Sequence, residues 1–128
     1  MNEYMMLFRN EQTEGAAPPS AEQMQAVMQQ WQSWIKGIAE QGKFRSTGRL
    51  QSEGKTLKPG NVMTDGPYAE GKEIIGGYLT VKASSLDEAV ELAKSCPALL
   101  AGGKVEVRSL MAIDDDFRSG KFLLPKNV

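Results

Sequence analysis

The stretch that decides the fold is "TDGPYAEGKEIIGGYLTV", residues 64–81, in which a crowded polar loop leads into an apolar strand. The loop carries a carboxylate at Asp65, a phenol at Tyr68 and several further charges, which is more than a plain turn requires. The strand contains Gly76 and Gly77 in its middle, and such a pair indicates a β-bulge or the close approach of another backbone or a ligand. We therefore interpret the loop as either the rim of a small-molecule site or an elaborate strand connection.

A strand and a long amphipathic helix precede this stretch. Residues 3–9 are apolar on both alternating faces, which predicts a strand covered at least partly on each side. A helix is predicted over residues 21–41, where Ser20 and Gln23 have the spacing of a capping box and Gly42 supplies a left-handed end. The apolar stripe of this helix consists of Met24, Val27, Met28, Trp31, Trp34, Ile35 and Ile38. The stripe predicts that the helix packs against a core.

Two further strands complete the centre of the chain. We predict one over residues 44–50, followed by a short β excursion with turns at residues 53–54 and 59–60. The second covers residues 74–82. Strict alternation places Ile75, Leu79 and Val81 on one face of this strand and Ile74, Tyr78 and Thr80 on the other.

A second helix and a last strand follow. Ser85 and Glu88 again have capping-box spacing, and the helix is expected to end before Pro97. Its expected core face consists of Leu86, Ala89, Val90 and Ala93. Alternation within "KVEVRSLMAI", residues 104–113, predicts the final strand, and the tail at residues 114–128 has apolar residues with little regular period.

The order of elements predicts an α+β fold of the ferredoxin-like βαββαβ type, with an antiparallel sheet and two helices on one face. The uncovered face would then carry the apolar side chains of Met5, Leu7, Ile74 and Tyr78. Because burying each such side chain is worth about 1.5–3 kcal/mol, a sheet-to-sheet homodimer is the simplest prediction. Cover by the tail at residues 114–128 is the alternative.

Composition indicates one globular domain, which we place at residues 1–113. The chain has 128 residues, of which 41% are hydrophobic, and its 15 basic and 16 acidic side chains leave a net charge of −1. Such a balance does not favour nucleic acid or an anionic membrane as a partner. A start without the basic residues of a secretory signal and a single cysteine, Cys96, favour a cytoplasmic location.

The sequence contains no histidine. This absence excludes Ser-His-Asp and Cys-His nucleophile systems and imidazole as a general base, so acid–base chemistry would need a carboxylate, Lys, Tyr, Cys96 or bound water. The acidic triplet at residues 114–116 lacks the spaced ligands of a calcium loop. We therefore predict no metal site and no cofactor.

The segments "DGPYAEGKEIIGGYLTVKASSLDEAVELAKSCP", residues 65–97, and "GGKVEVRSL", residues 102–110, closely resemble the YCII-related family. The likeness covers most of residues 3–113 and is strongest to the branch named after its Asp-Gly-Pro-Phe motif, with Tyr68 in place of the phenylalanine. This resemblance implies a ferredoxin-like fold assembled as a dimeric α/β barrel. Some relatives are enzymes that act on small, often aromatic or chlorinated compounds through paired His and Asp residues. Asp65 occupies the position of that aspartate, while the histidine has no counterpart. Members of the branch are also often labelled as transcription-initiation proteins.

Asp65 is the candidate catalytic residue. One interpretation is a carboxylate at a strand end, with its pKa raised by burial in a cleft. The other is an Asx-turn residue that accepts hydrogen bonds from nearby backbone amides around residues 67–69, and the two can coexist. The candidate ligand-binding residues are Tyr68, Trp34, Arg49 and Arg9. Each has a structural alternative: a buried ring for Tyr68, core packing for Trp34, and exposed ion pairing for the two arginines.

The leading functional hypothesis is a homodimer that holds a small organic molecule in a cleft near Asp65. If it is an enzyme, the expected chemistry is cofactor-free proton transfer or elimination with Asp65 as the base. The alternative hypothesis is a non-catalytic regulatory or protein-interaction module associated with the transcription machinery.

Overall fold

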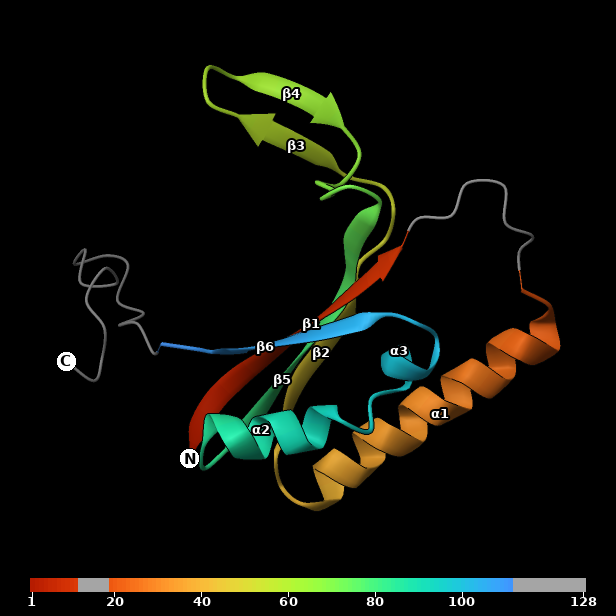
Figure 1. Ribbon diagram of the computed structural model, residues 1–128, viewed down its shortest axis with the longest axis vertical. Helices are drawn as coiled ribbons and strands as arrows, with labels where there is room; N and C mark the ends of the chain where they lie inside the picture. The colour runs from red at the N-terminus through yellow and green to blue at the C-terminus, as the bar shows by residue number, and fades with distance from the viewer. Residues whose placement is uncertain (12–18, 112–128) are drawn as a thin grey trace.

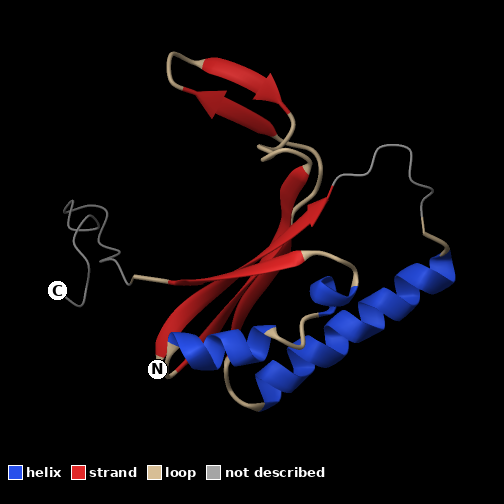
Figure 2. Cartoon of the chain, in the orientation of Figure 1, coloured by secondary structure: helices blue, strands red, loops and turns tan. Residues whose placement is uncertain are grey.

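The computed structural model describes residues 1–11 and 19–111, and the predicted tail at residues 114–128 lies outside them. A four-stranded sheet carries the helices on one side, and a separate two-stranded hairpin stands beyond one end of the sheet (Figures 1 and 2). The elements are β1 (Asn2–Glu11), α1 (Ala21–Glu40), β2 (Phe44–Arg49), β3 (Lys55–Lys58), β4 (Val62–Asp65), β5 (Glu73–Ala83), α2 (Leu86–Ala93), α3 (Pro97–Leu100) and β6 (Lys104–Ser109).

The main sheet has the strand order β2-β5-β1-β6, and each neighbouring pair is antiparallel. The predicted α+β class and antiparallel sheet are therefore confirmed, and the arrangement is compatible with a ferredoxin-like fold. The predicted β excursion is a real hairpin, β3–β4, inserted between β2 and β5. Its turn lies at residues 59–61, where Gly60 and Asn61 adopt φ angles of 84° and 61°.

The core lies between the sheet and the helices. Alternate residues of β1 and β5 point to this side because successive side chains of a strand face opposite ways. The buried apolar residues are Tyr4, Met6, Phe8, Ile38, Leu79, Val81, Ala83, Ala89, Ala93, Cys96 and Ala98. Trp31 packs edge-on against Phe8 with ring centroids 5.0 Å apart, and the core role expected for its ring is confirmed.

The first helix is capped as predicted but packs over only half of its length. Ser20 Oγ accepts from the Gln23 amide at 3.1 Å, and Gln23 Oε1 accepts from the Ser20 amide at 2.9 Å. However, the stripe residues of the first two turns, Met24, Val27 and Met28, are 38%, 47% and 53% exposed. A 20-residue helix is about 30 Å long, so its N-terminal half extends past the sheet (Figure 1). The expectation of packing along the whole stripe was wrong for these three residues.

The second helix differs from its prediction in two ways. Ser85 Oγ accepts from the Glu88 amide at 3.1 Å, but the Glu88 carboxylate bonds to Ser84, so the capping box is not reciprocal. Of the expected core face, Ala89 and Ala93 are buried, whereas Leu86 and Val90 are 45% and 37% exposed. Because α2 has only two turns, small residues bring it close to the sheet and its larger side chains remain at the edge. After Pro97, which occupies the first turn of a new helix, the chain forms the short α3.

The predicted bulge in β5 is present and changes which side chains share a face. Phe8 lies opposite Gly77 and Arg9 opposite Ile75, so Gly76 is the extra residue. Residues directly opposite in an antiparallel pair point to the same side of the sheet. The extra residue therefore reverses the side to which each residue of β5 before the bulge points. Ile75 joins Tyr78 on the side away from the helices, and the placement of Ile74 there was wrong.

The close backbone approach expected at the glycine pair also occurs. A Cβ atom added to Gly77 would lie 2.9 Å from the carbonyl oxygen of Gly48 in β2. Real Cβ atoms do not come so near to a backbone oxygen, so a side chain here would push the strands apart. Glycine at this position allows β2 and β5 to pair.

Candidate functional site

We call the face of the main sheet that points away from the helices the open face. Its centre consists of Met5 and Leu7 from β1 with Ile75 and Tyr78 from β5, all of which are half-buried. Leu7 lies directly opposite Tyr78, so these two residues are neighbours on this face. The open face is therefore apolar at its centre, although no helix among the described residues covers it.

Tyr78 lies across the neighbouring strand on the open face. A Cβ atom added to Gly48 would be 2.7 Å from Tyr78 Cε1 and 2.9 Å from its hydroxyl oxygen. The absence of a side chain at Gly48 thus leaves the space that the ring occupies. Beside it, Ser46 Oγ and Thr80 Oγ1 form a hydrogen bond at 2.5 Å. The β2 side of the open face therefore has little side-chain bulk apart from one aromatic ring.

Charged pairs surround the apolar centre. Arg9 binds the Glu106 carboxylate through Nε at 3.2 Å and Nη2 at 3.1 Å. The other pairs are Glu3–Arg45, Glu73–Lys104 and Arg108–Glu106. An apolar centre with a polar rim is the usual composition of a protein interface. Since exposed ion pairs contribute only about 0–1 kcal/mol each, their role here is to define the edge of the surface.

Asp65 lies at the end of β4, at the base of the hairpin, and its side chain is 96% exposed. The described residues of the single chain therefore do not provide the burial expected for a catalytic carboxylate. Its nearest cation is Lys55, whose Nζ is 3.9 Å away. Within residues 1–11 and 19–111, the amides of Tyr68 and Ala69 do not donate to this carboxylate, so the Asx-turn interpretation is also not realised.

Hydrogen bonds to the Gly66 backbone hold this loop instead. The Gly66 amide donates to the Gly54 carbonyl at 2.7 Å, and Thr56 Oγ1 donates to the Gly66 carbonyl at 3.1 Å. Gly66 has a φ of 89°, a conformation that side chains rarely adopt. The Asp65 carboxylate is thus not needed for the turn and is available to solvent or to a partner.

The other candidate residues lie apart from one another. Tyr68 is 73% exposed in the loop after β4, so its ring is not buried. Arg49 is exposed at the end of β2 without an ion pair in the described part of the chain, whereas Arg9 is held by Glu106. Trp34 belongs to the helix layer, where its Nε1 donates to the Leu92 carbonyl at 3.0 Å. Asp65 and Tyr68 share the base of the hairpin, and Trp34 is not part of that region.

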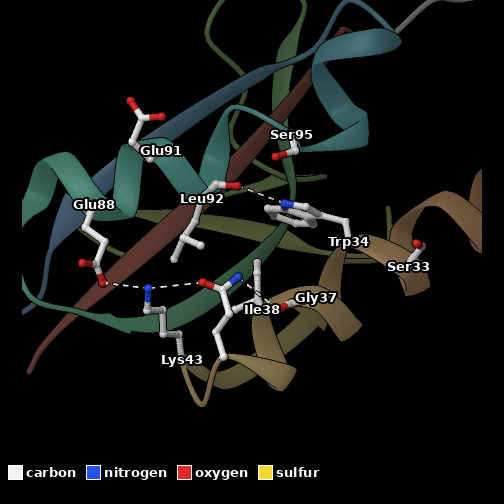
Figure 3. Close-up of a pocket in the computed structure, with 10 residues that line it drawn as sticks. Ser33, Trp34, Gly37, Ile38, Lys43, Glu88, Glu91, Leu92 and Ser95 are labelled. Atoms are coloured by element: carbon white, nitrogen blue, oxygen red, sulfur yellow. Dashed lines mark hydrogen bonds and ion pairs between the residues drawn. The ribbon is translucent and has the colours of Figure 1, made fainter.

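Sequence reasoning missed a groove between α1 and α2. The groove has a volume of about 430 Å³ and is lined by Trp34, Ile38, Lys43, Glu88 and Leu92 among others (Figure 3). Lys43 Nζ bridges Glu88 at 3.1 Å and Gln41 Oε1 at 3.2 Å. Hydrogen bonds from Ser84 and Lys43 hold the pKa of Glu88 below its usual value. Because Lys43 and Glu88 are 45 positions apart in the chain, no local pattern signals their contact.

The family now follows from comparison with known proteins. The YCII-related domain matches residues 3–114 of this chain. The chain belongs to the YCII-related family. A relative, "Uncharacterized protein R00369" of Rhizobium meliloti (strain 1021), is 31% identical over 113 residues, which cover 84% of this chain and 90% of the relative. The family expected from the motif block is thus confirmed.

Two features limit the chemistry of this YCII-related chain. The sequence has no histidine, so a paired His and Asp cannot form. Cys96 is buried, and burial raises the pKa of its thiol to about 11, which makes it a poor nucleophile at neutral pH.

The described residues contain no group of three potential metal ligands, and the triplet at residues 114–116 lies outside them. None of the helices in the described ranges could cross a membrane.

Proposed function

We propose that this YCII-related protein is a cytoplasmic homodimer of the Asp-Gly-Pro-Phe branch. In this proposal two chains pair the open faces of their sheets as a dimeric α/β barrel and hold a small organic molecule near Asp65. The Asp65-Gly66-Pro67-Tyr68 sequence supports the branch.

The apolar centre of the open face carries the proposal. Met5, Leu7, Ile75 and Tyr78 lie together on a surface that none of the described helices covers. Burying a large apolar side chain completely is worth about 1.5–3 kcal/mol, and these half-buried residues gain part of that when a second sheet covers them. A two-fold axis lets the same surface serve both partners, which is the commonest form of homodimer.

The small residues of β2 support a ligand site at one side of such an interface. Two copies that meet through Met5 and Leu7 leave space over Ser46 and Gly48, whose side chains are short or absent. Packed sheets lie about 10 Å apart, so a gap of this kind accommodates a flat organic molecule. Tyr78 offers it an aromatic surface, and Asp65 offers a carboxylate at the hairpin base.

In this proposal the chemistry at the site is proton transfer. A carboxylate can act as a general base if a partner or ligand removes it from water. Asp65 is the group we assign to this role, in a proton-transfer or elimination reaction that needs no cofactor. Arg49, exposed at the end of β2, is a charged group that could bind an anionic substituent.

Ligand-induced thermal stabilisation tests the proposed site. Purified protein would be screened against small aromatic and chlorinated aromatic compounds, and hits would be repeated with Asp65→Asn and with Asp87→Asn as the control. Asp87 is an exposed carboxylate in the first turn of α2. We expect Asp65→Asn to keep the dimer and lose the thermal shift, while Asp87→Asn keeps both. Equal shifts in the two variants would rule out Asp65 as a ligand contact.

A further inference from the structure

The β3–β4 hairpin projects from the domain as an arm, defined here as residues 54–66. Its strands pair with each other as a separate two-stranded sheet. In Figure 1 the arm stands beyond the end of the main sheet, and its tip turns to the side away from α1 and α2. The open face also lies on the side away from the helices. The arm therefore extends toward the region that a second sheet would occupy.

The two faces of the arm differ in character. Register places the pairs Leu57–Met63 and Lys55–Asp65 on one face, and Thr56–Thr64 and Lys58–Val62 on the other. Leu57 and Met63 are 65% and 57% exposed. One face thus presents an adjacent apolar pair beside the Asp65 carboxylate, and the other is mostly polar.

The arm is held in place at its base. The hydrogen bonds between Gly54, Thr56 and Gly66 close its open end, and the Glu70 and Glu73 backbones exchange two hydrogen bonds at 3.0 and 3.1 Å where β5 begins. A two-stranded hairpin alone is marginally stable in water and usually needs a packed face. An exposed Leu57–Met63 pair on a defined hairpin therefore indicates a surface that packs in the assembled protein.

The area of the open face favours a second copy as the partner of this surface. The sheet is four strands wide, and its shorter strands have six residues. At about 4.8 Å between strands and 3.3 Å per residue, the planar footprint is about 400 Å². A stable interface buries about 800 Å² of accessible surface on each partner. Side chains that project from the sheet add accessible surface to this flat footprint, but the sheet alone remains a small interface. Two arms related by symmetry would enlarge it.

We propose that, in the homodimer on which this inference rests, the Leu57–Met63 face of each arm packs against the second copy of the chain. Asp65 lies on that same face, so each arm carries its carboxylate to the open face of the other subunit. The ligand site is then composite, with Asp65 from one chain and Tyr78 and Gly48 from its partner. This arrangement explains why the described residues of its own subunit leave the Asp65 side chain 96% exposed.

Photo-crosslinking from the arm tests this proposal. A benzophenone maleimide would be attached to Leu57→Cys, and to Lys36→Cys on α1 as the control. Both parent residues are exposed, and the native Cys96 is buried, so the label enters at the introduced cysteine. We expect irradiated Leu57→Cys to form a covalent dimer on a denaturing gel. In mixed dimers of isotopically labelled and unlabelled chains, the crosslinked peptides should join the two kinds of chain. Lys36→Cys should remain a single chain.

A matched pair of charge substitutions provides the second measurement. Met63→Glu lies on the face assigned to the partner, and Val62→Glu lies on the opposite face with a similar exposure of 54% against 57%. We expect Met63→Glu to raise the dimer dissociation constant at least tenfold and Val62→Glu to change it less than threefold. A monomeric wild type would overturn the proposed function and this inference together. A dimer with only intrachain crosslinks and equal effects of the two substitutions would overturn this inference alone.

Discussion

Two neighbouring glycines, Gly77 and Gly48, should respond very differently to the same added methyl group. In Gly77→Ala the new Cβ would lie 2.9 Å from the Gly48 carbonyl oxygen, and a paired backbone cannot move without separating β2 from β5. Overpacking of this kind costs about 1–3 kcal/mol, and alanine recovers about 0.5–1 kcal/mol of unfolded-state entropy. The midpoints of these ranges give an expected net loss of about 1 kcal/mol, or roughly 3–5 °C in Tm for a chain of this length.

Gly48→Ala meets a side chain instead of backbone. Its Cβ would lie 2.7 Å from Tyr78 Cε1, at the far end of a ring that can rotate away. We expect a change in stability within about 0.5 kcal/mol, because the same entropy term offsets a small loss of packing. The displaced ring belongs to the open face, so the dimer dissociation constant should rise even though the fold persists.

Thermal unfolding at two protein concentrations separates these effects, because the Tm of a dissociating dimer depends on concentration whereas a change within the subunit lowers Tm at both. Circular dichroism would report Tm, and sedimentation velocity would report the dissociation constant. The reasoning is refuted if Gly48→Ala lowers Tm as much as Gly77→Ala, or if Gly77→Ala leaves it unchanged.

Three further predictions concern the helix layer. The Cys96 thiol, with a pKa of about 11, should be thiolate in roughly one molecule per thousand at pH 8, so a disulfide reagent should react with it only after denaturation. The pKa of Glu88 is lowered from 4.5 by Ser84 and Lys43, so its contribution to stability is present above that pH and is lost as pH falls through the folded-state value. Urea unfolding should therefore show Glu88→Gln to be less stable than wild type at pH 7 and the difference to shrink by pH 3; a difference independent of pH would contradict this. Trp34→Phe loses the bond to an α2 carbonyl and should cost about 0.5–1.5 kcal/mol, and an unchanged urea midpoint would contradict that expectation.

The elements with strong local signals were predictable from the sequence. Ser20 and Gln23 encode a helix start through groups three residues apart, and Gly76-Gly77 marks a bulge because only glycine tolerates the backbone approach that occurs there. The consequence of the bulge was not predicted. Whether Ile74 or Ile75 points to the open face depends on which residue of β5 is left unpaired between the partners of Phe8 and Arg9.

The candidate site was less predictable because it depends on contacts between distant segments. The motif around Asp65 correctly indicated a loop held by specific hydrogen bonds. The exposure of the Asp65 side chain could not be predicted from a local pattern, because burial depends on which other segments pack on the loop. Likewise, the apolar residues of α1 keep the same helical spacing from Met24 to Ile38, so the pattern does not show where packing ends. The extent of the sheet determines that point. Arg9 and Glu106 meet through strand pairing across 97 positions, which composition does not reveal.

The molar mass of the wild-type protein in solution tests the central claim most directly. Light scattering coupled to size-exclusion chromatography at micromolar concentration should give twice the chain mass of 14.0 kDa, because the open face of each subunit is covered by another. A mass of a single chain under those conditions would contradict the pairing of open faces and the site built on it.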